Sequence, residues 1–190
     1  MNNIGLEDWH LKLVGEFREK LIEDFSNFHI FVEADLQSSL SRLMRDFVAK
    51  HENTNWKIYN QPYQKIKKSE IGTYPDLLVT RKGIKRIAIE LKQSAMRKNV
   101  PFENVVKDVH KLGDMGNEVD KTYLIYTCYV SDLDKQKEEK TALQDAADRY
   151  ENPPNIMIIN LTCISDHGSW KAEMSRHLTN LSQYYGGAKV

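Results

Sequence analysis

The chain has no long uninterrupted apolar run and only two cysteines. None of its 190 residues belongs to a stretch that could span a bilayer, and the first residues, MNNIGLEDWH, have no signal-peptide pattern. Cys128 and Cys163 lie in separate apolar segments. We expect two buried free thiols, with a metal pair or a disulfide as the alternative. These absences predict a cytoplasmic protein that does not enter a membrane.

The chain also lacks net charge, because 27 lysine and arginine residues balance 27 aspartate and glutamate residues. The charges are segregated, however. The segment from Lys57 to Lys111 carries 13 basic and 5 acidic residues, a net of +8. Such a segment favours contact with a phosphate backbone, although a solvated surface with segregated charges would give the same count. The length and the 41% apolar content predict a single domain over 1–190 with a sizeable core.

The spacing of apolar residues predicts an α/β protein. A period of about 3.6 residues predicts helices over 6–27, 31–51, 101–113, 132–150 and 169–184. Short β-rich runs predict strands over 55–64, 77–80, 84–91, 122–130 and 155–161. We expect an N-terminal accessory helix within 1–30, packed on the core or on a second subunit. A core over 31–161 follows, and then a C-terminal helix and tail over 162–190.

The segment Tyr74–Ser94 has the pattern of a β-hairpin with charged residues on one face. Side chains alternate across a strand, so Glu90 and Lys92 share a face. A three-residue loop over 81–83 places Asp76 diagonal to Glu90 on that face, whereas a two-residue loop over 82–83 places the two acids on opposite faces. We predict the three-residue loop, with Gly83 in its left-handed position.

Two carboxylates on one face repel each other unless a cation lies between them. A hard divalent ion such as Mg²⁺ suits oxygen ligands and keeps open positions for water and a substrate phosphate. Lys92, on the same face, can hold the attacking water or stabilise the charge that develops. Asp76, Glu90, Lys92 and a metal ion therefore form a minimal site for phosphodiester hydrolysis.

The pair Pro75-Asp76, followed by Glu90-Leu91-Lys92, resembles the motif of the PD-(D/E)XK nuclease superfamily. The resemblance covers roughly residues 31–161. It implies the restriction-endonuclease-like fold, with an α-β-β-β-α-β core and a central mixed sheet flanked by helices. It also implies Mg²⁺, which Mn²⁺ can replace, bound by Asp76 and Glu90 with the Leu91 carbonyl as a further ligand. Nothing in the sequence indicates an organic cofactor.

Glu33 lies near the start of the second predicted helix, on its buried side. In the resembled family a glutamate from the first core helix often joins the metal site, which would make Glu33 a third metal ligand. The alternative is a first-turn glutamate favoured by the helix dipole, and Asp35 is a possible substitute. Residues that the sequence offers for contact with nucleic acid are Gln93, Lys67, Lys68, Arg97, Lys98, Lys107 and Lys111.

These features predict a metal-dependent nuclease that hydrolyses DNA, of the restriction, defence or repair type. The alternative from another class is an inactive member of the fold that binds nucleic acid or a protein partner. A third possibility is an α/β protein in which Asp76 and Glu90 merely pair with Lys92, Lys85 or Arg86. A homodimer is also expected, because cutting both strands with one site per chain needs two chains.

Overall fold

The structure is a computed structural model that describes residues 4–27, 29–30, 32–51, 55–62, 75–93, 102–129, 133–166 and 169–175. Its helices are α1 (Leu6–Lys12), the π-helical turn η1 (Leu13–Phe17), α2 (Arg18–Ser26), α3 (Glu33–Ala49), α4 (Phe102–Met115) and α5 (Leu133–Ala147). Its strands are β1 (Trp56–Asn60), β2 (Leu77–Arg81), β3 (Ile84–Gln93), β4 (Lys121–Tyr129), β5 (Asn155–Asp166) and β6 (Ser169–Ser175).

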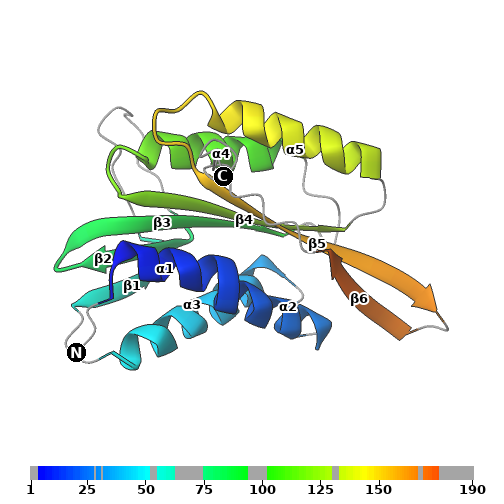
Figure 1. Ribbon diagram of the computed structural model, residues 1–190, viewed down its shortest axis with the longest axis horizontal. Coiled ribbons are helices and arrows are strands. Elements are labelled where there is room, and N and C mark those ends of the chain that lie inside the picture. The colour runs from blue at the N-terminus through cyan, green and yellow to red at the C-terminus, as the bar shows by residue number, and fades with distance from the viewer. Residues whose placement is uncertain are drawn as a thin grey trace, which may run out of the picture.

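The strands form one mixed sheet in the order β1-β2-β3-β4-β5-β6. The first three strands are an antiparallel meander, β3, β4 and β5 are parallel, and β6 runs antiparallel to β5. Helices α1, α2 and α3 cover one face of the sheet, and α4 and α5 cover the other (Figure 1). The α/β class and the order helix, three strands, helix, strand from α3 to β4 agree with the sequence prediction.

Each face of the sheet has its own apolar core, because strand residues alternate between the two sides. Ile87, Ile89 and Leu91 of β3 pack with the N-terminal helices. Ala88, on the other face, packs with the apolar stripe of α4. Glu90 and Lys92 lie two and four residues after Ala88 in the strand. Their side chains therefore point toward α4, as that of Ala88 does.

The N-terminal helical segment is part of the core. Trp9 is fully buried, with its ring 5.0 Å from that of Phe47 in α3 and 5.6 Å from that of Trp56 in β1. Leu13 and Phe17 of the same segment are buried as well. Of the two packing partners expected for this segment, the structure selects the core. No helix in the described part of the chain is long and apolar enough to cross a membrane.

The hairpin between β2 and β3 differs from the prediction in its turn. Lys82 and Gly83 form a two-residue turn with φ angles of 52° and 77°, the left-handed pair typical of tight hairpins. The predicted three-residue loop is therefore wrong. The register shifts between Val79 and Thr80, because Arg86 is an extra residue on β3. This bulge brings Leu77 opposite Ile89, which restores Asp76 and Glu90 to neighbouring positions.

The predicted helix over 169–184 is wrong for the residues that the structure describes. Ser169–Ser175 form β6, which pairs with β5 from Asp166↔Ser169 to Asn160↔Ser175. The alternation of Trp170, Ala172 and Met174 with polar residues is the two-residue period of a strand. The rest of that prediction lies outside the described residues. Cys128 and Cys163 belong to β4 and β5, but the description does not extend to their side chains.

Candidate active site at the divergence of strands β2 and β3

Asp76 lies at the point where the chain enters β2. Its Oδ2 accepts a hydrogen bond of 2.7 Å from the backbone N–H of Leu91. Because β2 begins only at Leu77, this carboxylate takes the place of a strand carbonyl as the acceptor. The Asp76 carbonyl accepts hydrogen bonds from Gln37 Nε2 at 2.7 Å and from the Gln61 N–H at 2.9 Å. The residue is thus held between α3, β1 and β3.

Glu90 is the most buried acid of the site, with 3% of its surface exposed. It points from β3 toward α4, where the Nζ of Lys111 lies 2.6 Å from its Oε1. Burial raises the pKa of Glu90 to about 8, against the opposing effect of Lys111, and the charge of Asp76 adds to the rise. Lys111 alone therefore does not keep Glu90 ionised at neutral pH, and a further positive charge would be needed to do so.

Lys92, two residues further along β3, lies between two other acids. Its Nζ is 3.2 Å from Asp108 Oδ2 in α4 and 3.5 Å from Glu33 Oε2 in α3. Burial lowers the pKa of Lys92, but Asp108 and Glu33 outweigh that effect, and the net shift is upward. Lys92 is therefore a protonated ammonium group. One of its two acid partners comes from α3 and the other from α4, which cover opposite faces of the sheet.

Glu33 is the first residue of α3. The neighbouring acid, Asp35, accepts a hydrogen bond from the Val32 N–H at 3.0 Å and so serves the helix start itself. This leaves Glu33 free of the capping role and directed at Lys92. Burial, together with the charge of Asp76, raises the pKa of Glu33, while Lys92 lowers it. Of the two acids considered from the sequence, the structure brings Glu33 to the site.

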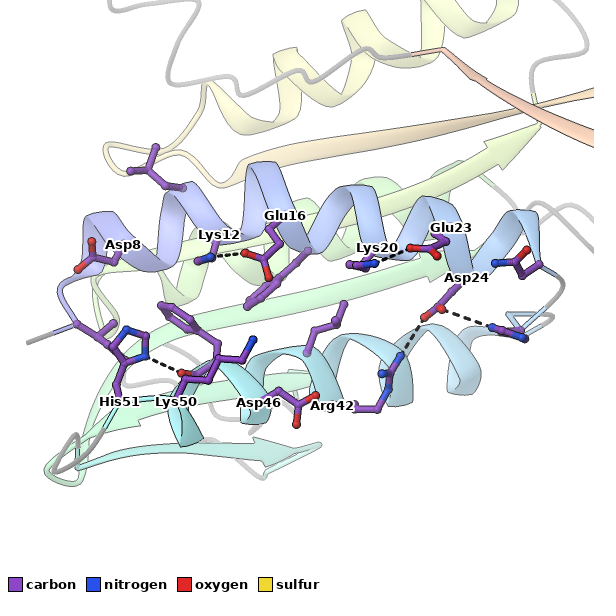
Figure 2. A pocket seen from close by; sticks show the side chains of 17 residues that line it. Asp8, Lys12, Glu16, Lys20, Glu23, Asp24, Arg42, Asp46, Lys50 and His51 are labelled. Carbon is purple, nitrogen blue, oxygen red and sulfur yellow. Dashed lines mark hydrogen bonds and ion pairs between the residues drawn. The ribbon is translucent and has the colours of Figure 1, made fainter. Parts of the chain in front are cut away.

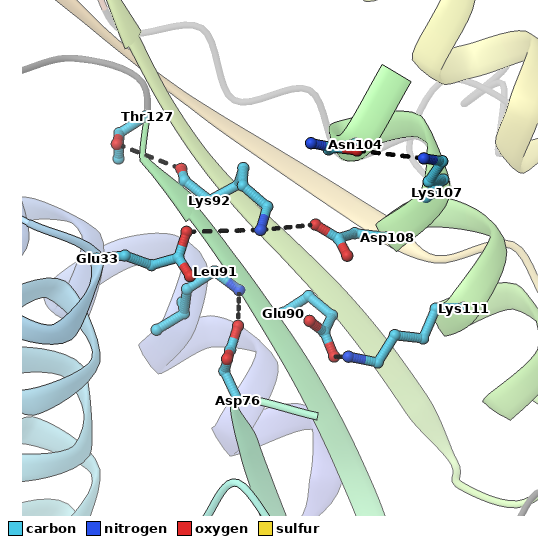
Figure 3. A network of polar contacts seen from close by, with 10 residues as sticks. All are labelled: Glu33, Asp76, Glu90, Leu91, Lys92, Asn104, Lys107, Asp108, Lys111 and Thr127. Atoms are coloured by element: carbon cyan, nitrogen blue, oxygen red, sulfur yellow. Dashed lines mark hydrogen bonds and ion pairs between the residues drawn. The ribbon is translucent and has the colours of Figure 1, made fainter. Parts of the chain in front are cut away.

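Figure 3 shows the resulting network, in which residues from α3, β3 and α4 converge beside Asp76. It contains the carboxylates Glu33, Asp76, Glu90 and Asp108 and the ammonium groups Lys92 and Lys111. Four negative and two positive charges give the fully ionised set a net charge of −2. A site of this composition repels a phosphate until a cation is added.

Asp108 is a functional candidate that the sequence prediction missed. Burial raises the pKa of Asp108, against the opposing effect of Lys92. The available signal was its spacing of three residues from Lys111, which puts both side chains on one helix face. On the same helix, Lys107 instead contacts Asn104 at 3.3 Å and is exposed.

The donor set suits a hard divalent ion, because such ions bind carboxylate oxygens. Asp76 and Glu90 are near enough for the charge of Asp76 to raise the pKa of Glu90. Within the described ranges, no three His, Cys, Asp or Glu side chains are grouped closely enough to hold a metal ion as they lie. Two lysines instead neutralise three of the acids. A metal ion would thus fit the chemistry of the site but would compete with Lys111 for Glu90.

The other predicted contacts have different outcomes. Gln93 is buried, and neither polar atom of its amide has a hydrogen-bond partner among the described residues. By alternation it points away from Lys92, to the opposite face of the sheet. Lys85 and Arg86 pair with Glu118 and Asp120, at 3.3 and 2.7 Å, rather than with the site acids. Four predicted DNA contacts lie outside the described residues: Lys67, Lys68, Arg97 and Lys98.

Comparison of the chain with protein-family models, with curated proteins and with solved structures finds no match.

Proposed function

We propose that this protein is a metal-dependent nuclease that hydrolyses DNA phosphodiester bonds, with a restriction-endonuclease-like core and a PD-(D/E)XK site. The observation that carries the proposal is the convergence of Asp76, Glu90 and Lys92 where β2 and β3 diverge. The element order from α3 to β4 and the mixed sheet support it. The bulge at Arg86 supports it further, because pairing of Leu77 with Ile89 brings Asp76 beside Glu90 rather than diagonal to it, as the predicted loop would have.

Asp76 and Glu90 would hold Mg²⁺ or Mn²⁺, with Glu33 at the edge of the same site. The ion would polarise the phosphate and lower the pKa of a bound water. In the metal-free protein, Asp108 and Glu33 raise the pKa of Lys92, so its ammonium group is a hydrogen-bond donor there. Its role in the proposal is to orient the attacking water and to stabilise charge on the phosphate oxygens. Asp108 and Glu33 hold its ammonium group in place.

The charge of the site supports a requirement for the ion. Fully ionised, the set has a net charge of −2 and would repel a phosphodiester, and one dication, which would also favour ionised Glu90, brings the sum to zero. The basic segment from Lys57 to Lys111, with 13 basic against 5 acidic residues, then favours approach of the nucleic-acid backbone.

The proposal is tested by incubating the protein with single-stranded and duplex DNA in Mg²⁺, Mn²⁺ or EDTA. We expect cleavage only with the ion, and a loss of about 100-fold or more in Asp76→Asn, Glu90→Gln and Lys92→Met. Lys137→Met, an exposed lysine on α5 outside the predicted nucleic-acid contacts, is the matched control and should cut normally. Ion-independent cleavage, or equal activity in all variants, would overturn the proposal.

A second candidate is an inactive member of the same fold that binds nucleic acid. The contact that favours it is Lys111 with Glu90 at 2.6 Å, because an internal ammonium group already supplies the positive charge that an ion would bring. DNA binding that weakens with salt, needs no divalent ion and leads to no cleavage would select this candidate.

A homodimer remains a proposal for cleavage of both strands. The apolar face of the segment α1 to α2 is not available for it, because Trp9, Phe17 and Phe25 are buried within the chain. Sedimentation of the protein with and without duplex DNA tests this, and a single monomeric species in both conditions would exclude the dimer.

A further inference from the structure

Lys111 lies where a cation would balance Glu90. Its Nζ is 2.6 Å from Glu90 Oε1, and a quarter of its side chain is exposed while that of Glu90 is almost wholly buried. The residue projects from α4 toward the sheet, whereas Lys107, one turn earlier, contacts Asn104 on the same helix (Figure 3). The helix therefore directs one lysine into the site and keeps the other outside it.

The contact between Lys111 and Glu90 is incompatible with a close dication on that carboxylate. Mg²⁺ binds an oxygen at roughly 2.1 Å and would lie within a few ångströms of the ammonium group. Like charges at such a distance repel strongly in a buried site. Lys92 does not contact Asp76 or Glu90, the two acids proposed to hold the ion, because its partners are Asp108 and Glu33. Lys111 is therefore the lysine that has to move.

We infer that a divalent ion displaces Lys111 from Glu90, and that the freed ammonium group then contacts a phosphate of the nucleic acid. The inference rests on the proposed function and adds a second role for this lysine, as a counter-ion before the metal and a substrate contact after it. The long side chain allows the movement, since its charged end can swing toward solvent while its stem stays packed.

Displacement of Lys111 also implies an order of binding, with the ion before the nucleic acid. Before the ion arrives, Lys111 is the positive charge that lies against the most buried acid of the site. After the ion arrives, the ammonium group remains on α4 beside the site, so an approaching phosphate meets a positive charge. The metal-free protein should accordingly hold DNA less well than the loaded one.

The first experiment measures the reactivity of single lysines toward acetylation by mass spectrometry, at fixed pH, in the full chain. Mn²⁺ alone should raise the labelling of Lys111 several-fold, and a DNA duplex added with non-cutting Ca²⁺ should lower it again. Lys107 serves as the internal control, because it is exposed and contacts Asn104 instead of an acid of the site. Unchanged labelling of Lys111 while calorimetry records a bound ion would overturn the inference.

The second experiment is calorimetric titration of Mn²⁺ into wild type and Lys111→Met. Removing the competing ammonium group should strengthen the binding of Mn²⁺ by about tenfold, equivalent to about 1.4 kcal/mol. Two buffers of different protonation enthalpy correct for any proton that Glu90 releases. Lys107→Met, which changes an exposed lysine that contacts Asn104, should leave ion affinity unchanged. Equal or weaker affinity in Lys111→Met would contradict displacement.

Different results would overturn the proposed function and the displacement of Lys111. If wild type takes up no ion that Asp76→Asn removes, both the proposed function and the inference are lost. If the ion binds and DNA is cut while Lys111 stays on Glu90, only the inference is lost. With the inference correct, Lys111→Met binds the ion more tightly yet cuts DNA more slowly, a combination that loss of a merely structural contact would not produce.

Discussion

At the scale of single residues, the site is a set of acids that outnumber their ammonium partners. Each carboxylate lies close to another charged group, and burial strengthens every one of those interactions. Glu90 is the extreme case, because it is almost fully buried and has Lys111 on one side and Asp76 on the other. Its ionisation should therefore affect the stability of the whole protein.

We predict that the metal-free protein loses stability as the pH rises from 4.5 to about 8, relative to Glu90→Gln. In this window the unfolded chain has released the Glu90 proton and the folded protein still binds it, so raising the pH favours unfolding. The difference in free energy of unfolding should change by at most about 1.4 kcal/mol per pH unit. Urea denaturation of both proteins across the window measures it, and parallel curves would contradict the raised pKa.

Asp108 is expected to act through Lys92. In Asp108→Asn, burial would lower the pKa of Lys92 with less opposition, since Asp108 is the main charge that raises it. The alkaline limb of the cleavage profile should move to lower pH, with a larger change in kcat than in KM. Asp114→Asn, on an exposed position of α4, is the control. A cleavage profile that does not move would show that Asp108 has no influence on Lys92.

The sequence was sufficient to predict that Glu90 and Lys92 share one face of β3, because strand alternation is a local pattern, and both side chains contact α4. It was not sufficient for Asp108, whose role depends on how closely α4 approaches β3. The pairing of Lys111 with Glu90 was missed for the same reason: a charged residue on a helix has no sequence signal for the strand it will face.

At the scale of elements, the hairpin of β2 and β3 sets the site through two compensating features. The tight turn at Lys82 and Gly83 alone would separate the acids, and the extra residue at Arg86 returns them to neighbouring positions. The signal for the bulge was present in the sequence. Ile84 and Ile87 are three residues apart, which breaks the two-residue period that Ile87, Ile89 and Leu91 then follow.

Gly83→Ala tests the turn. The position has a φ of 77°, so a side chain there should cost about 1 kcal/mol of stability. Gly15→Ala is the matched control, because a Cβ at that helical position meets no atom within 4 Å and alanine favours a helix. Thermal or urea denaturation should therefore show a loss for Gly83→Ala alone. Equal stability of the two variants would argue against the left-handed turn.

The other missed element, β6, has a comparable explanation. The polar and apolar residues over 169–184 fit both the helical period of about 3.6 residues and the strand period of two. The prediction followed the helical period. The alternation of Trp170, Ala172 and Met174 extends over only seven residues, so a longer window favours the wrong structure. Pairing with the long strand β5 then selects the strand, which a local pattern cannot show.

At the scale of the whole molecule, the N-terminal segment is a layer of the protein rather than an attachment to it. The helices α1 and α2 lie against α3 and the sheet (Figure 1), and their aromatic residues join the same core as the strands that carry the site. A groove of about 800 Å³ runs between α1, α2 and α3 on the outer side (Figure 2). Its charged residues largely pair with one another, as Lys20 does with Glu23 and Arg42 with Asp24.

Trp9→Ala should therefore destabilise the protein by about 3–5 kcal/mol, since it empties a fully buried site between Phe47 and Trp56. Leu11→Ala, two residues away and 59% exposed, should change stability by less than about 0.5 kcal/mol. Urea denaturation of the two variants measures the difference. A small effect of Trp9→Ala would mean that the segment is an accessory after all.

The central claim is that Asp76 and Glu90 together hold a divalent cation beside Lys92. The most direct measurement is anomalous diffraction from a crystal of the protein soaked in Mn²⁺. The account predicts one strong peak in contact with carboxylate oxygens of both residues, with Lys111 turned away from Glu90. The contradicting result is a fully occupied Mn²⁺ site elsewhere in the crystal and no peak between the two acids, with Lys111 still in contact with Glu90.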